Sequence, residues 1–344
     1  MVELNWNQLG FGYTKTNTIV TTYFKNGEWG KVESNTDDNL TLNAFAGVFH
    51  YSIECFEGLK AYRGKDGKIR LFRPEENARR MQRAANFLGI AAPSEELFID
   101  MCVQAALENE EFIPPYGNMA TLYLRPTLIG YNPTLGVKSA EECLFMVLCA
   151  PVGPYSGNLL EPINSVISRN YDRAATYGTG SYKIGANYAI SIFSYNKARS
   201  IGYKSALYLD PATHSKIDEF AAANFFGIKN NTFVTPLSDS VLPSITNKSL
   251  MELAPTLGIK VERRDIPVEE LSTFEEVGEC GTAVCITPIS YIEDKDSLEG
   301  EVTKRYTFFS ETECGPVSLK LYQTLTGIQF GEIEDPFGWC KIIK

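Results

Sequence analysis

The middle of the chain reads Gly178-Thr179-Gly180-Ser181-Tyr182-Lys183-Ile184-Gly185-Ala186-Asn187-Tyr188, with one lysine among small residues and two tyrosines. Small neighbours leave room for a planar ligand to approach the lysine amine, and such an amine can form a Schiff base with a carbonyl compound. A glycine-rich stretch before a helix is also typical of an ordinary turn with a solvated lysine. The rest of the chain must distinguish these two interpretations.

Length and composition are those of an ordinary globular protein. Single cores stop growing at about 250–300 residues, so a chain of 344 residues is predicted to form two domains. The formal net charge of -10 argues against nucleic acid or an anionic membrane as the main partner. No apolar run is long enough to span a bilayer and residues 1–10 lack a signal-peptide pattern, which predicts a cytoplasmic location.

Cysteine and histidine usage narrows the possible chemistry. The 8 cysteines include no C-x-x-C pair, so we interpret them as reduced core residues. Only two histidines exist, His50 and His214, which removes most histidine-based metal sites and leaves two candidates for a Ser-His-Asp arrangement. We therefore expect no metal and a catalytic base other than histidine.

Hydrophobic periodicity predicts two α/β domains joined near residue 155, where a Pro/Gly cluster at 151–158 marks a linker. A hairpin is predicted at 61–72, followed by helices at 77–88 and 95–108, the second capped by Ser94. The other predicted strands are 18–24, 45–53, 119–129, 142–149, 165–170, 205–209, 220–228, 232–237, 259–263 and 282–289. The other predicted helices are 188–200, 246–257 and one starting at Pro316.

If Lys183 forms a Schiff base with an aldehyde cofactor, pyridoxal 5'-phosphate is the natural candidate. Its pyridine nitrogen needs a carboxylate, its phenolic oxygen a donor, and its phosphate a helix N-terminus with a cation. Glu219 adjoins an apolar stretch in which a carboxylate requires a partner, and a pyridinium would be one.

The phosphate has a candidate site at the predicted helix that follows Leu242. The N–H groups of Ile245 and Thr246 would be unpaired donors there, although a plain helix capped by Ser244 gives the same pattern. Arg80 could supply the cation, but most helix arginines are simply solvated.

The segment Tyr123-Leu124-Arg125-Pro126 places Tyr123 and Arg125 on one face if it is a strand. An arginine in such an apolar strand costs free energy unless it meets an anion. A substrate or a buried carboxylate could serve.

Five motifs in register resemble the branched-chain amino acid aminotransferases, pyridoxal-phosphate enzymes of fold type IV, over nearly the whole chain. They are Phe56-Glu57-Gly58-Leu59-Lys60-Ala61, Arg70-Leu71-Phe72-Arg73-Pro74, Tyr123-Leu124-Arg125-Pro126, Tyr182-Lys183-Ile184-Gly185-Ala186-Asn187-Tyr188 and Gly281-Thr282-Ala283. The resemblance implies a smaller N-terminal α/β domain (1–152), an interdomain loop (153–162) and a larger pyridoxal-phosphate domain (163–344). In that larger domain a β-barrel-like core has flanking helices. It also implies a homodimer with the active site near the subunit interface.

The resemblance also implies a role for each site residue. Lys183 would hold the cofactor and, once released, shuttle the proton between the substrate Cα and the cofactor C4′. The other implied cofactor residues are Arg80, Ile245, Thr246 and Thr282 for the phosphate, Glu219 for the ring nitrogen, Tyr188 for the phenolic oxygen and Leu242 under the ring. The implied substrate residues are Phe11, Tyr51, Phe56, Tyr123, Arg125, Tyr155, Thr282 and Ala283. The implied reaction exchanges the amino group of leucine, isoleucine or valine with 2-oxoglutarate in two half-reactions.

Two departures from the family and several rivals bear on this hypothesis. Ala221-Ala222 stands where many members carry glycine or a hydroxyl, which removes a side-chain bond to the cofactor there, and Val284 and Thr287 replace a redox C-x-x-C pair. D-Amino acid aminotransferases and aminodeoxychorismate lyases lack the Tyr-x-Arg-Pro and Phe-Glu-Gly combination in this register. A non-catalytic carrier of the cofactor would not need Tyr123 or Arg125.

Overall fold

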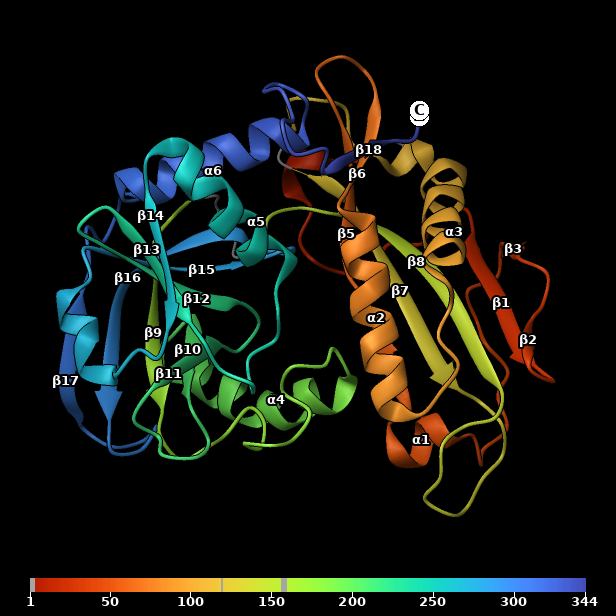
Figure 1. The fold of residues 1–344 in the computed structure, drawn as a ribbon, viewed down its shortest axis with the longest axis horizontal. Helices are drawn as coiled ribbons and strands as arrows, with labels where there is room; N and C mark the ends of the chain where they lie inside the picture. The colour runs from red at the N-terminus through yellow and green to blue at the C-terminus, as the bar shows by residue number, and fades with distance from the viewer. Residues whose placement is uncertain (1–3, 119, 156–159) are drawn as a thin grey trace. The chain divides into compact units, whose positions relative to one another are not determined.

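The computed structural model describes residues 4–118, 120–155 and 160–344, which form two compact units (Figure 1). The first unit comprises Met1–Gly157, Tyr182–Gly185 and Gly327–Lys344. The second comprises Asn158–Ser181 and Ala186–Thr326. The chain thus enters the first unit for four residues around Lys183 and then returns to the second. Residues 156–159 of the predicted interdomain loop lie outside the described residues.

The first unit is built on a 9-stranded sheet whose main path follows the order β18-β6-β5-β7-β8-β1-β2, with β3 paired to β1 and β4 to β7. The strands are β1 (Ile19–Lys25), β2 (Glu28–Trp29), β3 (Glu33–Asn35), β4 (Glu54–Phe56), β5 (Leu59–Arg63), β6 (Ile69–Phe72), β7 (Thr121–Gly130), β8 (Cys143–Val152) and β18 (Cys340–Ile342). β7 is central because it pairs with β8 along its whole length. On its other edge it pairs with β5 around Leu124 and with β4 around Leu128.

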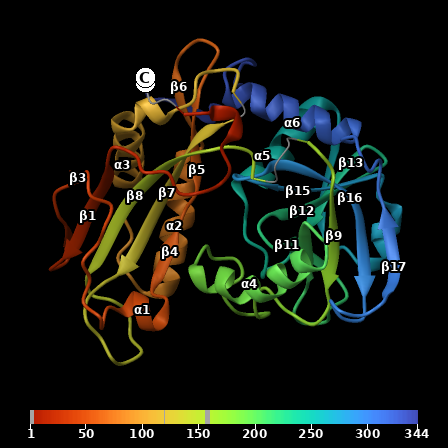
Figure 2. The same cartoon turned by 180° about the vertical axis from the view of Figure 1, so that it is seen from behind.

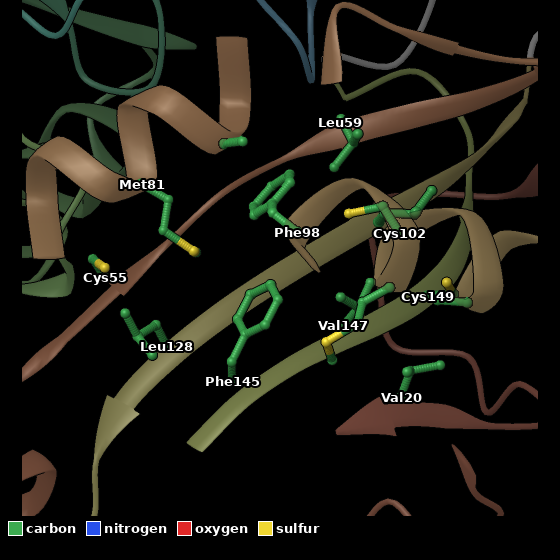
Figure 3. Packing of buried hydrophobic residues seen from close by; sticks show 14 of the residues in the cluster. Val20, Cys55, Leu59, Met81, Phe98, Cys102, Leu128, Phe145, Val147 and Cys149 are labelled. Atoms are coloured by element: carbon green, nitrogen blue, oxygen red, sulfur yellow. The ribbon is translucent and has the colours of Figure 1, made fainter. Parts of the chain in front are cut away.

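Two helices, α2 (Pro74–Leu88) and α3 (Glu95–Glu108), cover one face of this sheet (Figure 1). Pro74 opens α2, and the side chain of Ser94 accepts from the N–H of Leu97 at 3.0 Å to cap α3, as predicted. Figure 3 shows the core between helices and sheet, where Phe98 of α3 faces Phe145 of β8 with ring centroids 5.7 Å apart. Each buried ring of this size contributes about 1.5–3 kcal/mol relative to an exposed one.

The second unit contains a closed barrel. Its strands follow the order β11-β10-β9-β16-β15-β12, and the additional pairing of β11 with β12 closes the ring of six. The ring strands are β9 (Ile163–Ser168), β10 (Ser205–Leu209), β11 (Ile217–Phe220), β12 (Asn224–Lys229), β15 (Glu276–Gly281) and β16 (Cys285–Lys295). Further strands are β13 (Thr232–Pro236), β14 (Lys260–Arg264) and β17 (Val302–Thr307). Phe220, Phe225 and Val277 belong to the apolar core of this unit.

Helices α4 (Gly185–Ser200), α5 (Ile245–Leu253) and α6 (Pro316–Gln329) lie outside the barrel strands (Figure 2). Short 3-10 turns cover Trp6–Gln8, Glu110–Phe112, Ala254–Leu257 and Val268–Thr273. Glu276 of β15 accepts from the N–H groups of Val317 and Ser318 and so holds the start of α6. Within the described residues, no helix combines the length and the apolar character that crossing a membrane requires.

Three element predictions were wrong. The segment 45–53 contains helix α1 (Gly47–Tyr51) instead of a strand, because Phe45, Phe49 and Ile53 recur at a spacing of four, which suits a helix. The segment 220–228 is two paired strands, since the uniform run of small and apolar residues does not mark the reversal at 221–223. The predicted strand at 282–289 begins only at Cys285, after a turn. The predicted fold class, an N-terminal α/β part and a barrel with flanking helices, is confirmed.

Candidate active site

Lys183 lies in a segment of the first unit whose neighbours are well anchored. Ile184 is 2% exposed and joins the core, while the ring of Tyr182 stacks on Phe87 with centroids 4.1 Å apart. The N–H of Phe56 donates to the Lys183 carbonyl at 3.1 Å. The Lys183 amine lies 4.6 Å from the centroid of the Phe56 ring. A lysine with these contacts is not the solvated lysine of an ordinary turn.

A row of aromatic side chains continues from Phe56. Arg125 lies over both Phe56 and Tyr123, with its guanidinium carbon 4.9 Å and 5.3 Å from the two ring centroids. Phe11 meets Tyr123 edge-on at 5.0 Å and Tyr155 at 5.2 Å. Six of the predicted site residues are therefore contiguous within the first unit: Tyr155, Phe11, Tyr123, Arg125, Phe56 and Lys183.

Two glycines allow this row to form. A Cβ on Gly58 would fall on the Tyr123 hydroxyl, and one on Gly153 would fall on the carbonyl oxygen of Leu9. Gly153 also donates its N–H to the Gly10 carbonyl at 3.1 Å, which holds the N-terminal segment that carries Phe11. The Phe-Glu-Gly motif and the Pro/Gly cluster thus have a packing reason in this structure.

Arg125 is the least satisfied cation of the row. Within the described residues its Nε is buried without a hydrogen-bond partner, and its Nη2 has one long contact of 3.5 Å with the Tyr123 hydroxyl. In the described part of the chain no carboxylate forms a salt bridge with it. A largely enclosed guanidinium with unused donors is suited to bind an anion.

Arg80 is oriented by Glu57. Its Nε and Nη2 each lie 2.7 Å from a Glu57 oxygen, and Glu57 is fully buried. Asn77 donates to the same carboxylate at 2.7 Å. This fork-like pair fixes the plane of the Arg80 guanidinium, so the predicted phosphate ligand has a defined direction.

In the second unit, Glu219 is a buried carboxylate with three polar partners. It accepts from the N–H of Leu242 at 3.0 Å and from the Asn224 amide at 2.6 Å, and Arg173 Nη2 lies 2.7 Å away. Burial raises the pKa of Glu219, and Arg173 opposes this rise most strongly, followed by the Leu242 N–H. Asp218 adds to the rise by charge repulsion. The charge of Glu219 therefore depends on these opposing effects on its pKa, and a further cation nearby would favour the ionised form.

Arg173 also holds the glycine-rich stretch. Its Nη2 donates to the carbonyls of Gly180, at 3.0 Å, and of Ser240. A Cβ on Gly180 would fall on the Ser240 carbonyl oxygen, so this close approach requires glycine. On the helix side, the Asn187 amide donates to the Thr179 carbonyl at 2.7 Å. The glycines before Lys183 therefore serve backbone packing in the second unit.

The start of α5 has the features predicted for an anion site. Ser244 caps the helix by accepting from the Asn247 N–H at 3.2 Å. The N–H groups of Ile245 and Thr246 have no hydrogen-bond partner within the described residues, although these residues are only 6% and 5% exposed. Two unpaired and nearly buried amides at a helix start favour an anion such as phosphate.

The remaining predicted residues have fewer recorded contacts. Thr282 and Ala283 form the turn between β15 and β16, which the pairing of Gly281 with Cys285 closes, and both are partly exposed. Tyr188 is partly buried in the first turns of α4. Tyr51 lies on α1 and donates its hydroxyl to the Leu135 carbonyl, so it hydrogen bonds away from the aromatic row.

Sequence reasoning assigned no role to three residues that bear directly on the site: Glu54, Glu57 and Arg173. Each glutamate lies in the short apolar strand or turn before Leu59, where a carboxylate requires a partner, so that signal was available. Arg173 lies in the polar stretch Asn170-Tyr171-Asp172-Arg173, which has no periodicity that marks a buried cation. Only the fold brings it to Glu219.

Comparison with known proteins gives a consistent result. The family model described as amino-transferase class IV matches residues 54–292. The branched-chain-amino-acid aminotransferase of Haemophilus influenzae is 47% identical and covers 100% of both chains. A crystal structure of the branched-chain amino acid aminotransferase of Escherichia coli has a TM-score of 0.79 at 26% identity, covering 96% of this chain and 100% of that one. The branched-chain amino acid aminotransferase of Thermobaculum terrenum, solved in its PLP-form, has a TM-score of 0.78 at 19% identity, with coverages of 96% and 99%.

Proposed function

The chain belongs to the branched-chain amino acid aminotransferases of the amino-transferase class IV family. From this membership we propose that it transfers the amino group of leucine, isoleucine or valine to 2-oxoglutarate, in two half-reactions, with pyridoxal 5'-phosphate as its cofactor. The observation that carries the proposal is the row in which Lys183 and Arg125 both lie over Phe56. It combines a reactive amine, an apolar wall and a guanidinium suited to an anion.

The residues present fit the cofactor. Glu219 is a buried carboxylate for the ring nitrogen, and the unpaired N–H groups of Ile245 and Thr246 suit the phosphate. When bound, pyridoxal 5'-phosphate supplies an aldehyde that reacts with an amine and a ring that accepts electrons from the substrate. Lys183 would hold the cofactor covalently. Arg80 and Thr282 would add to the phosphate site, Tyr188 would donate to the phenolic oxygen, and Leu242 would pack against the ring.

The site residues would each have a separate chemical task. The Lys183 amine, once released, would take the proton from the substrate Cα and deliver it to the cofactor C4′, and it would carry the proton in the opposite direction during the second half-reaction. Glu219 would keep the proton on the ring nitrogen, and Arg173 favours the ionised carboxylate that this role requires. The relay therefore needs no histidine.

One pocket must accept both a branched apolar side chain and the side chain of glutamate. Phe11, Phe56, Tyr123 and Tyr155 would provide an apolar surface for leucine. The Arg125 guanidinium would bind the distal carboxylate of glutamate. The backbone of Thr282 and Ala283 would bind the α-carboxylate that both substrates share.

The test is the Lys183→Ala variant beside a matched lysine, Lys65→Ala, from the exposed hairpin turn. We expect Lys183→Ala to lose turnover of leucine with 2-oxoglutarate and to lose the visible absorbance of the bound cofactor. Lys65→Ala should retain both. Full activity in Lys183→Ala would reject the proposal. Leucine should bleach the visible absorbance band of the unsubstituted chain, whereas the band of a non-catalytic carrier would not change. A preference for D-alanine as the amino donor would indicate a D-amino acid aminotransferase.

We also propose that the chain forms a homodimer and works in the cytoplasm, with the interdomain loop at 153–162. Support for a dimer comes from α4, where Ile190, Ile192 and Phe193 are each more than half exposed. Light scattering during size-exclusion chromatography should give twice the mass of 38.3 kDa, and Phe193→Glu should lower that mass.

A further inference from the structure

Strand β4 holds the Lys183 segment at two points. Its Phe56 N–H donates to the Lys183 carbonyl at 3.1 Å. Two residues earlier, on the same face of the strand, the Glu54 carboxylate accepts from the N–H of Gly185, the first residue of α4. The main chain of Lys183 therefore lies between two hydrogen bonds from one short strand.

Gly185 allows this second contact. A Cβ at this position would fall on Oε1 of Glu54, so a side chain here would push the carboxylate away. The contact also suits the helix, because α4 is 16 residues long and its N-terminal N–H groups favour a negative charge. Glu54 thus satisfies the first amide of the helix that follows the lysine.

The charges around Glu54 favour the ionised form at this place. Burial raises the pKa of Glu54, and the Gly185 N–H, Arg125 and Lys183 oppose the rise in that order. The carboxylate is partly removed from water and sits in the field of both cations of the aromatic row. The Glu54 carboxylate is therefore a partner of the Gly185 N–H and not a solvated surface group.

The segment has further contacts through its side chains and within its own main chain. Tyr182 stacks on Phe87 and Ile184 lies in the core, so both neighbours of Lys183 are anchored through their side chains. The Ile184 N–H donates to the Tyr182 carbonyl at 3.1 Å, which folds the segment tightly at the lysine. After Gly185 the chain returns to the second unit. The bond to Glu54 thus holds the main chain on the first unit immediately after the lysine.

We propose that Glu54 is a positioning residue for Lys183, which fixes the lysine main chain through Gly185 so that the amine is presented at one place above Phe56. The proposal rests on the role of Lys183 given above. Glu54 itself has no chemical step; it acts through the segment that it holds.

The test compares Glu54→Ala and Glu54→Gln with Glu96→Ala, an exposed glutamate in the first turn of α3. In the chain without cofactor, hydrogen exchange of peptides covering 182–188 should be about tenfold faster in Glu54→Ala, as expected for the loss of a charged hydrogen bond. With cofactor, the kcat for leucine should fall about tenfold while KM changes less than about twofold. Glu54→Gln keeps an acceptor oxygen, so its exchange rate at 182–188 and its kcat should both return most of the way to those of the unsubstituted chain. Glu96→Ala should match the unsubstituted chain in both measurements.

Unchanged exchange at 182–188 in Glu54→Ala, with kcat within about twofold of the control, would overturn the proposal. Exchange is measured without cofactor, so this result is separate from the fate of Lys183→Ala, which tests the function. If Glu54→Ala does not fold, Gly185→Ala displaces the carboxylate while leaving Glu54 in place, and the same faster exchange is expected. Slow exchange in a folded Gly185→Ala chain would equally contradict the proposal.

Discussion

Arg125 in the first unit and Arg173 in the second are both enclosed cations near residues of the site, but they are used in opposite ways. Arg173 donates to two carbonyls and lies 2.7 Å from the Glu219 carboxylate. Arg125 has a buried Nε without a partner and lies on two aromatic rings. Arg173 thus uses its hydrogen-bond donors on acceptors of the chain itself, whereas Arg125 retains donors for a ligand.

This difference teaches how an arginine can be assigned from its partners. A guanidinium whose acceptors come from the chain itself stabilises a carboxylate and two backbone turns, so its removal should affect folding first. A guanidinium that the fold leaves short of acceptors carries a desolvation cost that only a bound anion offsets. Its removal should affect substrate choice first.

The largest effect is expected from Arg173→Met. Breaking a buried ion pair by removing one partner leaves Glu219 without its cation, and this typically costs about 3–5 kcal/mol. Two carbonyl groups also lose a donor. Urea unfolding should therefore show a loss of about that size, together with weaker retention of the cofactor.

The matched control is Arg79→Met, which removes a bidentate pair with Glu95 in which both side chains are exposed. Exposed pairs contribute about 0–1 kcal/mol, so its stability should change little. Equal stability of the two variants, with the cofactor retained in both, would show that Arg173 is not needed to support Glu219.

The contrast between the two arginines also marks what the sequence could predict. Arg125 stood out because it interrupts an apolar strand, whose period of two places it on the same face as Tyr123. In the structure the Arg125 guanidinium does lie over the Tyr123 ring. Lys183, the capped helices and the start of α5 followed from equally local signals. Five motifs in register gave the family, and with it the barrel.

The partners of these residues could not be predicted, because they come from segments far apart in the chain. Arg173 reaches Ser240 across 67 positions, and Glu57 reaches Arg80 across 23. Local patterns also failed where two structures share one pattern: the apolar residues of 45–53 suit a strand or a helix, and the fold chose α1. Glu54 was missed because its role depends on Gly185, which the chain brings to β4 only in the folded state.

The second effect concerns a barrel carboxyl group that forms no salt bridge within the described residues. Glu279 of β15 is 5% exposed, and burial raises its pKa to about 7 while the Ser205 hydroxyl opposes the rise. A folded-state pKa above the ordinary value of 4.5 means that the folded chain binds this proton more tightly than the unfolded chain. The stabilising contribution is complete below pH 4.5 and is lost as pH rises through about 7.

We therefore expect Glu279→Gln, which cannot ionise, to gain stability relative to the unsubstituted chain between those two pH values. The shift corresponds to about 3 kcal/mol across the window. Urea midpoints measured at several pH values check this, with the exposed Glu275→Gln as control. Parallel pH profiles for Glu279→Gln and the unsubstituted chain would mean that a barrel carboxyl needs no cation to stay charged, which would weaken the role given to Arg173.

The smallest effect is expected from Arg125→Leu, and it should fall on substrate choice. Loss of a charged hydrogen-bonded contact to the distal carboxylate should lower kcat/KM for glutamate about 100-fold, equivalent to about 2.7 kcal/mol. For leucine, which has no distal carboxylate, the change should stay within about threefold, because leucine makes no such charged contact. Stability should fall by about 1 kcal/mol, because the guanidinium loses its contacts with the Phe56 and Tyr123 rings although its buried Nε has no hydrogen-bond partner within the described residues. Arg63→Leu, which removes an arginine paired with Glu110 on β5, is the control. Equal losses of kcat/KM for glutamate and leucine would show that Arg125 shapes the pocket as a whole. Arg125 would then have a structural role, as Arg173 does, in spite of its different neighbours.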